Sequence, residues 1–282
     1  MIDVPIDAVS AHVYRIPTDA PEGDGTLAWD STTMILVEVR SGDTVGTGWT
    51  YGSPAVATVV TKTLAGIVTG RDALNIGGTW TAMVQAIRND GRPGAVGYAI
   101  SAVDIALWDL KARLLDVALH RLLGAVRDEV PVYGSGGFTT YTGDQLQRQV
   151  HGWVQEQSIP RVKIKIGESW GTQTGRDLDR IRQTRTIIGD DVELFVDANG
   201  GYQRKQAVRM MRAAGDLNIG WFEEPVSSDD LDGLRGVRDA VAADVTAGEY
   251  GHDLAYFQRM CAAGAVDCLQ ADASRCGGIT EW

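Results

Sequence analysis

The stretch Val162-Lys163-Ile164-Lys165-Ile166 is the first of several apolar runs that carry or precede a charged residue, and later runs lead to Asp197, Glu223, Glu249 and Asp272. The first two steps between these acids are both 26 residues and the third is 23 residues, which suits a strand, a crossover helix and two short loops. Apolar runs joined by helical segments are typical of buried parallel strands, and a β/α barrel keeps its chemistry at the C-terminal ends of its strands. The pattern therefore predicts a barrel with these acids at its mouth.

The predicted strands lie near residues 130–134, 161–166, 192–197, 219–223, 244–248 and 267–271. A complete TIM-type barrel needs roughly 250 residues, whereas 153 residues run from Val130 to Trp282. We therefore expect a modified TIM-type (β/α) barrel that is incomplete after the sixth strand. Because unpaired strand edges and exposed apolar surface promote association, we also expect a homo-oligomer.

The part of the chain before the barrel has an α+β pattern. The periodicities predict an antiparallel meander and then helices, at residues 8–14, 33–40 and 44–51 for the strands and 56–68, 79–88 and 97–115 for the helices. The polar stretch from Pro17 to Ser31 is expected to be a long loop that carries one large aromatic residue, Trp29. We place the domain boundary near residue 126, which gives an N-terminal α+β domain over 1–126 and a barrel domain over 127–282.

The composition excludes several classes of function. A net charge of −11 and a pI near 4.8 argue against a nucleic-acid or anionic-membrane binder, because both need a basic surface. The three cysteines are odd in number and contain no Cys-x-x-Cys pair, so a disulfide framework or a zinc site is not expected. The N-terminus does not have the pattern of an export signal, and no run of about 18 apolar residues occurs. We therefore expect a cytoplasmic protein without a membrane span.

Lys163 and Lys165 alternate with apolar residues on the second predicted strand of the barrel. Since side chains alternate faces along a strand, both amines should point into the barrel while the apolar set faces the outer helices. Two neighbouring ammonium groups lower each other's pKa, which would make one of them a base near neutral pH. A solvated strand edge is the simpler interpretation of an isolated Lys-x-Lys.

Asp197, Glu223 and Glu249 should converge at the barrel mouth, where their mutual repulsion requires a positive charge. Three oxygen ligands with open coordination positions suit Mg²⁺. The alternative is that each acid is a helix cap or a loop residue, and the equal spacing argues against it. Asn199 can reach the same mouth and donate to a substrate oxygen, although Asn199 before Gly200-Gly201 is also a plain turn.

These motifs resemble those of the enolase superfamily, in its mandelate racemase-like branch. The stretch Ala102-Val103-Asp104-Ile105-Ala106-Leu107-Trp108-Asp109-Leu110 is similar to the helix signature of that family's N-terminal capping domain. The resemblance implies that Lys165 is the base that removes the proton α to a carboxylate, and that Lys163 binds the carboxylate. It also implies that Asp197, Glu223 and Glu249 hold Mg²⁺. Asp272, followed by Ala-Ser-Arg-Cys-Gly-Gly, is similar to the acid that supports a catalytic histidine on the seventh strand of the family, about 25 to 30 residues farther on.

The resemblance implies a Mg²⁺-dependent enzyme that forms an ene-diolate from a small carboxylate substrate, with an acid-sugar dehydratase as the first expectation. A racemase or epimerase of a 2-hydroxy acid is the alternative enzyme. A non-catalytic fragment is the third possibility, because the residues of a seventh and an eighth strand are absent from the sequence. Substrate contacts are expected from the stretch that carries Trp29 and from Asn199.

Overall fold

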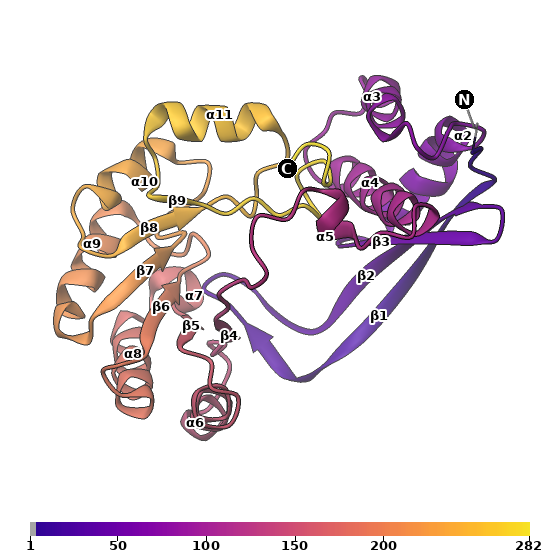
Figure 1. Ribbon diagram of the computed structural model, residues 1–282. Coiled ribbons are helices and arrows are strands. Elements are labelled where there is room, and N and C mark those ends of the chain that lie inside the picture. Colours follow the sequence, from indigo (N-terminus) through magenta and orange to yellow (C-terminus); the bar gives the residue numbers. More distant parts are fainter. Residues whose placement is uncertain (1–3) are drawn as a thin grey trace.

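A three-stranded antiparallel sheet, in the order β1-β2-β3, forms the N-terminal part of the computed structural model, which describes residues 4–282 (Figure 1). The strands are β1 (Ala8–Gly23), β2 (Ala28–Ser41) and β3 (Thr44–Tyr51). Ile35, Val37 and Val39 alternate on β2 and are fully buried. They belong to the same core cluster as the buried face of α4 (Ala95–Leu114). On β3 a side chain at Gly48 would approach the carbonyl oxygen of Ala102 to 2.1 Å, so α4 packs directly on the strand backbone.

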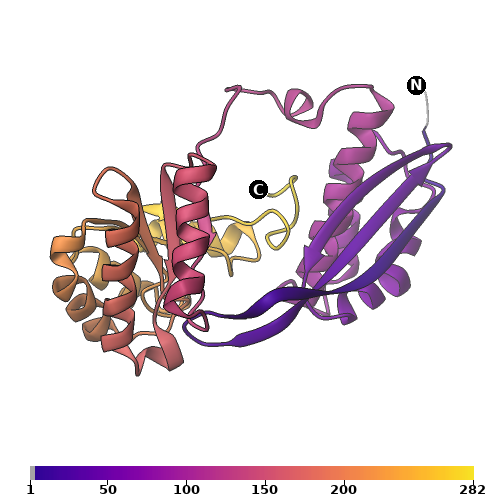
Figure 2. The same ribbon diagram turned by 90° about the horizontal axis from the view of Figure 1, so that it is seen from below.

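The predicted long loop from Pro17 to Ser31 is wrong. Strand β1 continues to Gly23 and β2 begins at Ala28, so most of this stretch is a hairpin that reaches away from the N-terminal part toward the second sheet (Figures 1 and 2). The register of β1 on β2 shifts between Pro17 and Glu22. β1 is an edge strand, where proline is tolerated because alternate N–H groups point away from the neighbouring strand.

Helices cover one face of the meander, in the regions in which the periodicity predicts them. Besides α4 they are α1 (Ala55–Val59), a π-helical turn (Val60–Leu64), α2 (Ala65–Val68), α3 (Ile76–Ala86) and α5 (Leu119–Leu122). The segment between α5 and the second sheet contains the predicted domain boundary near residue 126, which stays a prediction.

Six parallel strands in sequence order, β4 to β9, form the second sheet. They are β4 (Gly134–Gly136), β5 (Arg161–Lys165), β6 (Glu193–Asp197), β7 (Ile219–Glu223), β8 (Asp244–Ala247) and β9 (Cys268–Leu269). The prediction of a strand at 130–134 is wrong, because pairing to β5 begins only at Gly134 and Val130 and Val132 are exposed. A side chain at Gly134 would collide with the Trp153 ring, so the glycine lets a helix pack close to this edge.

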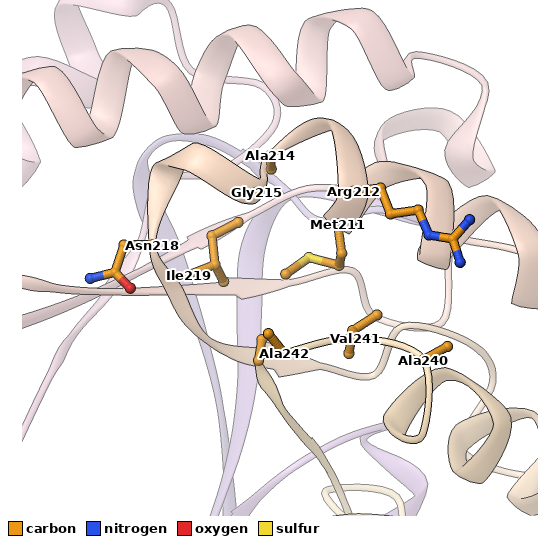
Figure 3. Close-up of a pocket in the computed structure, with 10 residues that line it drawn as sticks. Met211, Arg212, Ala214, Gly215, Asn218, Ile219, Ala240, Val241 and Ala242 are labelled. Carbon is orange, nitrogen blue, oxygen red and sulfur yellow. The ribbon is translucent and has the colours of Figure 1, made fainter.

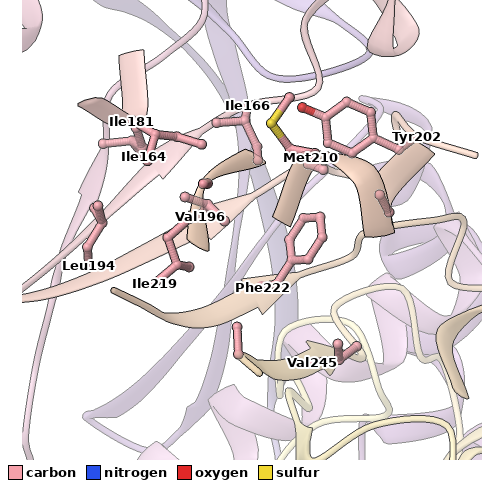
Figure 4. Packing of buried hydrophobic residues seen from close by; sticks show 14 of the residues in the cluster. Ile164, Ile166, Ile181, Leu194, Val196, Tyr202, Met210, Ile219, Phe222 and Val245 are labelled. Atoms are coloured by element: carbon pink, nitrogen blue, oxygen red, sulfur yellow. The ribbon is translucent and has the colours of Figure 1, made fainter. Parts of the chain in front are cut away.

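Helices connect consecutive strands and lie along the outer side of the second sheet (Figure 1). They are α6 (Gly143–His151), a π-helical turn (Gly152–Glu156), α7 (Glu168–Gly171), α8 (Thr174–Ile188), α9 (Arg204–Ala213), a 3-10 turn (Gly215–Leu217), α10 (Leu231–Arg238) and α11 (Leu254–Ala263). Ile164, Val196, Phe222 and Val245 of the strands are buried in one core with Ile181 and Met210 of the helices (Figure 4). The fold class is the predicted one, an α+β part followed by strands and helices of the β/α-barrel type. Within residues 4–282 no helix combines the length and the apolar character needed to cross a membrane.

The hairpin tip and the segment after β9 both join the parts. At the hairpin tip, the Gly25 carbonyl accepts a hydrogen bond from the Trp170 N–H at 2.8 Å, and a side chain at Gly25 would collide with the carbonyl oxygens of Ile166 and Ala198. The segment after β9 returns to α4, where the carboxyl group of Asp104 accepts hydrogen bonds from the N–H and the hydroxyl of Thr280. Both contacts bring N-terminal residues to the C-terminal ends of the parallel strands.

Candidate active site

Three neighbouring strands present charged side chains at their C-terminal ends. In the parallel register Lys165 of β5 stands beside Asp197 of β6, and Asp197 stands beside Glu223 of β7. Lys163 lies two residues before Lys165 and therefore shares its face. Both amines point to the inner side of the sheet, where they meet these acids, and the intervening Ile164 packs in the core on the other side.

The lysines and the acids form buried ion pairs. Lys165 Nζ donates to Asp197 Oδ2, Lys163 Nζ donates to Glu223 Oε2, and Lys163 Nζ lies 3.9 Å from Asp197 Oδ2. The second oxygen of Asp197 accepts the Asn199 N–H at 2.9 Å. Lys163 Nζ also lies 3.4 Å from the Tyr133 hydroxyl and 5.0 Å from the centre of its ring. Charge-assisted bonds of this kind are shorter and stronger than neutral ones, so the four groups hold one another in place.

The expected lowering of the lysine pKa is wrong for this arrangement. Burial opposes the charged form of both lysines, but the carboxylates of Asp197 and Glu223 outweigh it and raise the pKa of each above its ordinary value. Asp197 is also buried, yet the two lysines hold its pKa below the ordinary range. Burial and then the neighbouring Asp197 raise the pKa of Glu223 to about 7. The carboxylates, which the interpretation of the lysine pair left out, decide the protonation of the lysines.

Within the described residues Glu249 forms an ion pair with neither Lys163 nor Lys165. It follows β8, its side chain is 27% exposed, and its carboxylate lies 3.8 Å from Arg275 Nη1. In the part of the chain that the structure describes, no three His, Cys, Asp or Glu side chains are close enough together to hold one metal ion. The structure thus brings Asp197 and Glu223 together with both lysines, while Glu249 pairs with Arg275.

The remaining predicted site residues have different surroundings. Asp272 accepts hydrogen bonds from the Ser274 N–H and hydroxyl through Oδ1, and its Oδ2 lies 3.4 Å from Arg275 Nε. Asn199 has a buried Oδ1 without a hydrogen-bond partner. Trp29 donates to Glu22 at 2.8 Å and packs edge-on against Phe138, so its ring ties the hairpin to the segment after β4.

Glu224 is a site residue that the sequence interpretation missed. It is 1% exposed, has a positive φ of 38°, and its Oε1 is buried without a hydrogen-bond partner. Burial, followed by the charges of Glu249 and Asp197, raises its pKa well above the ordinary value. The sequence offered one indication of its role. In Glu223-Glu224-Pro225 a second acid follows the strand, and the end of an apolar strand does not require a second charged residue.

A cavity of about 570 Å³ opens at this end of the sheet. Its lining comes from the hairpin tip, the loop before α4, the loops after β5 to β8 and helix α11: Thr26, Pro93, Trp170, Asn199, Gly200, Glu224, Ser227, Ser228, Asp229, Tyr250, His252, Tyr256 and Arg259. Asn199 Oδ1 and Glu224 Oε1 are thus unpartnered acceptors among its lining residues. The cavity therefore suits a ligand that donates hydrogen bonds, such as a polyhydroxy compound or a hydrated cation.

A second cavity, of about 270 Å³, lies where β7 and β8 begin (Figure 3). Ile219 of β7 and Ala240 to Ala243 before β8 line it, and Arg212 is its one charged lining residue. It is at the opposite end of the strands from the lysines and acids. This cavity therefore contains none of the predicted site residues.

Comparisons with known proteins match both parts of the chain. Residues 16–124 match the model of the mandelate racemase / muconate lactonizing enzyme N-terminal domain, and residues 145–282 match the enolase C-terminal domain-like family. D-galactarolactone cycloisomerase of Agrobacterium fabrum is 32% identical over 98% of this chain and 73% of its own length. L-talarate/galactarate dehydratase of Salmonella typhimurium is 34% identical over 88% of this chain and 63% of its own.

Solved structures agree with this assignment. A mandelate racemase/muconate lactonizing enzyme-like protein from Rubrobacter xylanophilus superposes with a TM-score of 0.93 at 50% identity, over 98% of this chain and 76% of that one. A racemase from Streptomyces coelicolor with bound magnesium has a TM-score of 0.93 at 34% identity, over 98% of this chain and 78% of that one. The chain therefore spans about three quarters of the length of these two structures.

Proposed function

Because the chain belongs to the mandelate racemase-like branch of the enolase superfamily, we propose that it is a Mg²⁺-dependent acid-sugar dehydratase, which removes the proton α to a substrate carboxylate. The observation that carries the proposal is the pair of lysines, one buried and one partly buried, in register with two buried acids at the ends of adjacent parallel strands. Relatives named galactarate, arabinonate and rhamnonate dehydratases support a polyhydroxy acid as the substrate. The unpartnered acceptors of Asn199 and Glu224 suit the hydroxyl groups of such a compound.

Carboxylate side chains of this kind suit Mg²⁺, but Asp197, Glu223 and Glu249 lie too far apart in this structure to share one ion, so Glu249 would have to approach the other two acids when the ion binds. Asp197, Glu223 and Glu249 would hold it, since carboxylate oxygens are the ligands that this ion prefers and its remaining positions accept water or substrate. When bound, Mg²⁺ would stabilise the negative charge that forms on the substrate carboxylate. In the present arrangement Lys163 and Lys165 neutralise two of these acids, so the ion and the lysines compete for the same oxygens.

The side chains of this chain have distinct proposed roles. Lys165 Nζ would receive the α-proton, which requires that Asp197 no longer stabilise its charged form. Lys163 would bind the substrate carboxylate, and Asn199 and Trp29 would contribute to the substrate site. Asp272, beyond β9, is the third proposed catalytic residue and would support proton delivery.

A racemase or epimerase of a 2-hydroxy acid is the second candidate. The Streptomyces coelicolor racemase supports it, since it resembles this chain as closely in TM-score as any structure described above. Both reactions begin with the same proton removal, so the lysines and acids serve either one.

The test is a screen of acid sugars with Mg²⁺, in which a 2-keto product indicates dehydration and a change of optical rotation without a keto product indicates racemisation. Lys165→Ala should lose at least about 10²-fold in rate, the typical contribution of a general base. Lys205→Ala, on the exposed face of α9, is the matched control and should keep full activity. Equal loss in both variants, or full activity of Lys165→Ala, would remove Lys165 from its role.

We further propose a cytoplasmic homo-oligomer. Cys261, Cys268 and Cys276 are free thiols, as a reducing compartment allows. Trp49 and Tyr51 stack edge-on on β3 and are more than 40% exposed, which leaves an apolar surface available for a second copy. Light scattering at micromolar concentration tests the oligomer, and a monomer at all concentrations would contradict it.

A further inference from the structure

The turn that follows β9 is held by the N-terminal part of the molecule. The Thr50 hydroxyl of β3 donates to the Ser274 carbonyl at 2.8 Å, and the Gly277 N–H donates to the Ser101 hydroxyl of α4 at 2.9 Å, both in buried positions. The Trp80 indole of α3 donates to the Gly277 carbonyl at 2.8 Å. Three elements of the N-terminal part therefore fix this turn, on both sides of residue 275.

Gly277 and Gly278 permit this close contact. Both have positive φ, 99° and 85°, and a side chain at Gly278 would lie 2.3 Å from the Asp104 carboxylate. Positive φ is strained for residues other than glycine. The glycines thus let the turn lie directly on α4, and the turn has little freedom once docked.

Arg275 extends from the docked turn to the loop after β8. Its Nη1 donates to the Glu249 carbonyl at 3.1 Å and lies 3.8 Å from the Glu249 carboxylate. Its Nε lies 3.4 Å from Asp272, and its guanidinium group lies over the Tyr250 ring at 5.4 Å. One side chain thus holds Glu249 through both its main chain and its carboxylate.

We propose that Arg275 is a positioning residue that makes the placement of Glu249 depend on the docking of the N-terminal part. Thr50, Ser101 and Trp80 fix the position of the turn. The turn fixes the position of Arg275, and Arg275 in turn fixes the position of Glu249. This coupling rests on the proposed function in one respect, namely that Glu249 is a Mg²⁺ ligand. The N-terminal part would then control the affinity for Mg²⁺ through the hydrogen bond from Arg275 to the main-chain carbonyl of Glu249, a group that does not itself bind the ion.

The geometry requires arginine and not merely a positive charge. The planar guanidinium group donates in several fixed directions, whereas a lysine amine is a single point charge on a flexible chain. Arg275→Lys therefore keeps the charge beside Glu249 but cannot maintain the carbonyl bond, the Asp272 pair and the Tyr250 contact together. A purely electrostatic role would survive this substitution, and a positioning role would not.

The first experiment measures the Kd of Mg²⁺ by calorimetry on the substrate-free protein. Arg275→Lys should raise the Kd about tenfold, within the range of ordinary coupling between sites. Thr50→Val, which removes the donor to Ser274 with little change of shape, should raise it severalfold although Thr50 is on the other part of the molecule. The double variant should have the same Kd for Mg²⁺ as Arg275→Lys alone, because both substitutions interrupt the same series of contacts between the N-terminal part and Glu249. Thr81→Val, which loses a hydroxyl bond within α3, is the control and should match the wild type.

The second experiment does not need the metal. The Gly251 N–H donates to the Gly248 carbonyl at 2.8 Å and so reports on the Glu249 loop. Its hydrogen exchange in the absence of Mg²⁺ should be several times faster in Thr50→Val and in Arg275→Lys than in wild type and Thr81→Val. An unchanged exchange rate in Thr50→Val overturns the coupling, whatever the metal result. If wild type shows no saturable Mg²⁺ binding, the proposed function fails, while faster exchange would still support the structural coupling.

Discussion

Asp104 and Asp197 are equally buried, with no exposed surface on either residue. The pKa of Asp104 is nevertheless raised, whereas the pKa of Asp197 is lowered. Asp197 meets the two lysine amines, which hold its pKa below the ordinary value despite burial. Asp104 meets the N–H and the hydroxyl of Thr280, which carry no charge, and burial raises its pKa to about 6. Burial alone thus favours the neutral acid, and full positive charges reverse that effect. Charged partners thus keep Asp197 ionised in the cluster, whereas Asp104 has only the neutral donors of Thr280 at the docking contact.

Removing the acid from the charged cluster should give the largest effect on stability. Asp197→Asn leaves Lys165 without its carboxylate partner in a buried position, and breaking a buried pair in this way costs about 3 kcal/mol or more. Because the pKa of Asp197 is lowered on folding, its contribution is present above pH 3.8 and is lost as the pH falls through the folded-state pKa. Urea unfolding at pH 7 measures the loss, with the exposed Asp216→Asn as the control. Equal stability of the two variants would show that the lysines find other partners.

The buried acid at the docking contact should give a pH-dependent effect of opposite sign. The folded-state pKa of Asp104, about 6, exceeds its ordinary 3.8. Its contribution to stability is therefore present below pH 4 and is lost as the pH rises through 6. At 1.36 kcal/mol per pKa unit, Asp104→Asn should gain up to about 3 kcal/mol relative to wild type between pH 4 and pH 7. Unfolding midpoints of both proteins across this range test it, and parallel curves would contradict the assignment.

Loss of the Thr280 hydroxyl, the neutral donor to Asp104, should give a smaller effect on stability. Thr280→Val removes a hydroxyl that donates to Asp104 at 2.5 Å and accepts the Trp108 indole N–H at 2.9 Å. A lost hydrogen bond typically costs about 1 kcal/mol, and more when the acceptor is ionised. The destabilisation in thermal melts should therefore be larger at pH 8 than at pH 5. Thr186→Val, which loses a hydroxyl bond within α8, is the control. A destabilisation of Thr280→Val that does not depend on pH would show that the Thr280 hydroxyl does not act on ionised Asp104.

The exposed ion pair of Asp30 and Arg15 should give the smallest effect on stability. Asp30 lies 3.5 Å from Arg15, and both side chains are more than 70% exposed. Since water screens such pairs, Asp30→Asn should change the free energy of unfolding by less than about 0.5 kcal/mol. Added salt should not alter the result, and a larger loss in urea unfolding would mean that this pair holds the hairpin register.

The sequence was sufficient for features that depend on period and spacing. The alternation of Lys163 and Lys165 with apolar residues predicted their shared inward face, and the 26-residue steps predicted acids at the ends of successive strands. These features are local, because a strand fixes the direction of each of its side chains. Glu224 could not be predicted in this way, because its positive φ turns its side chain out of the alternation.

Features that depend on distant partners were not predictable. The interpretation of the stretch from Pro17 to Ser31 failed because its prolines and acids suit a loop, whereas pairing along β2 and docking at Gly25 stabilise a hairpin. Arg275 stands 26 positions from Glu249, and nothing in its neighbours indicates that it pairs with this acid. The pKa of each lysine likewise depends on which acid meets it, which only the three-dimensional arrangement decides.

The contact between α4 and the segment after β9 has a consequence for how the chain is made. Asp104 and Thr280 are 176 positions apart, and Thr50 and Ser274 are 224 apart. Domains generally fold as units during synthesis, the N-terminal one first, and at about 5 to 20 residues per second the ribosome needs some 10 to 40 seconds to supply these partners. During that interval Thr50, Ser101 and Asp104 lack the partners that the segment after β9 supplies. The pKa of Asp104 should therefore rise when the segment after β9 docks, so protonation favours the docking and the docking weakens as the pH rises through about 6.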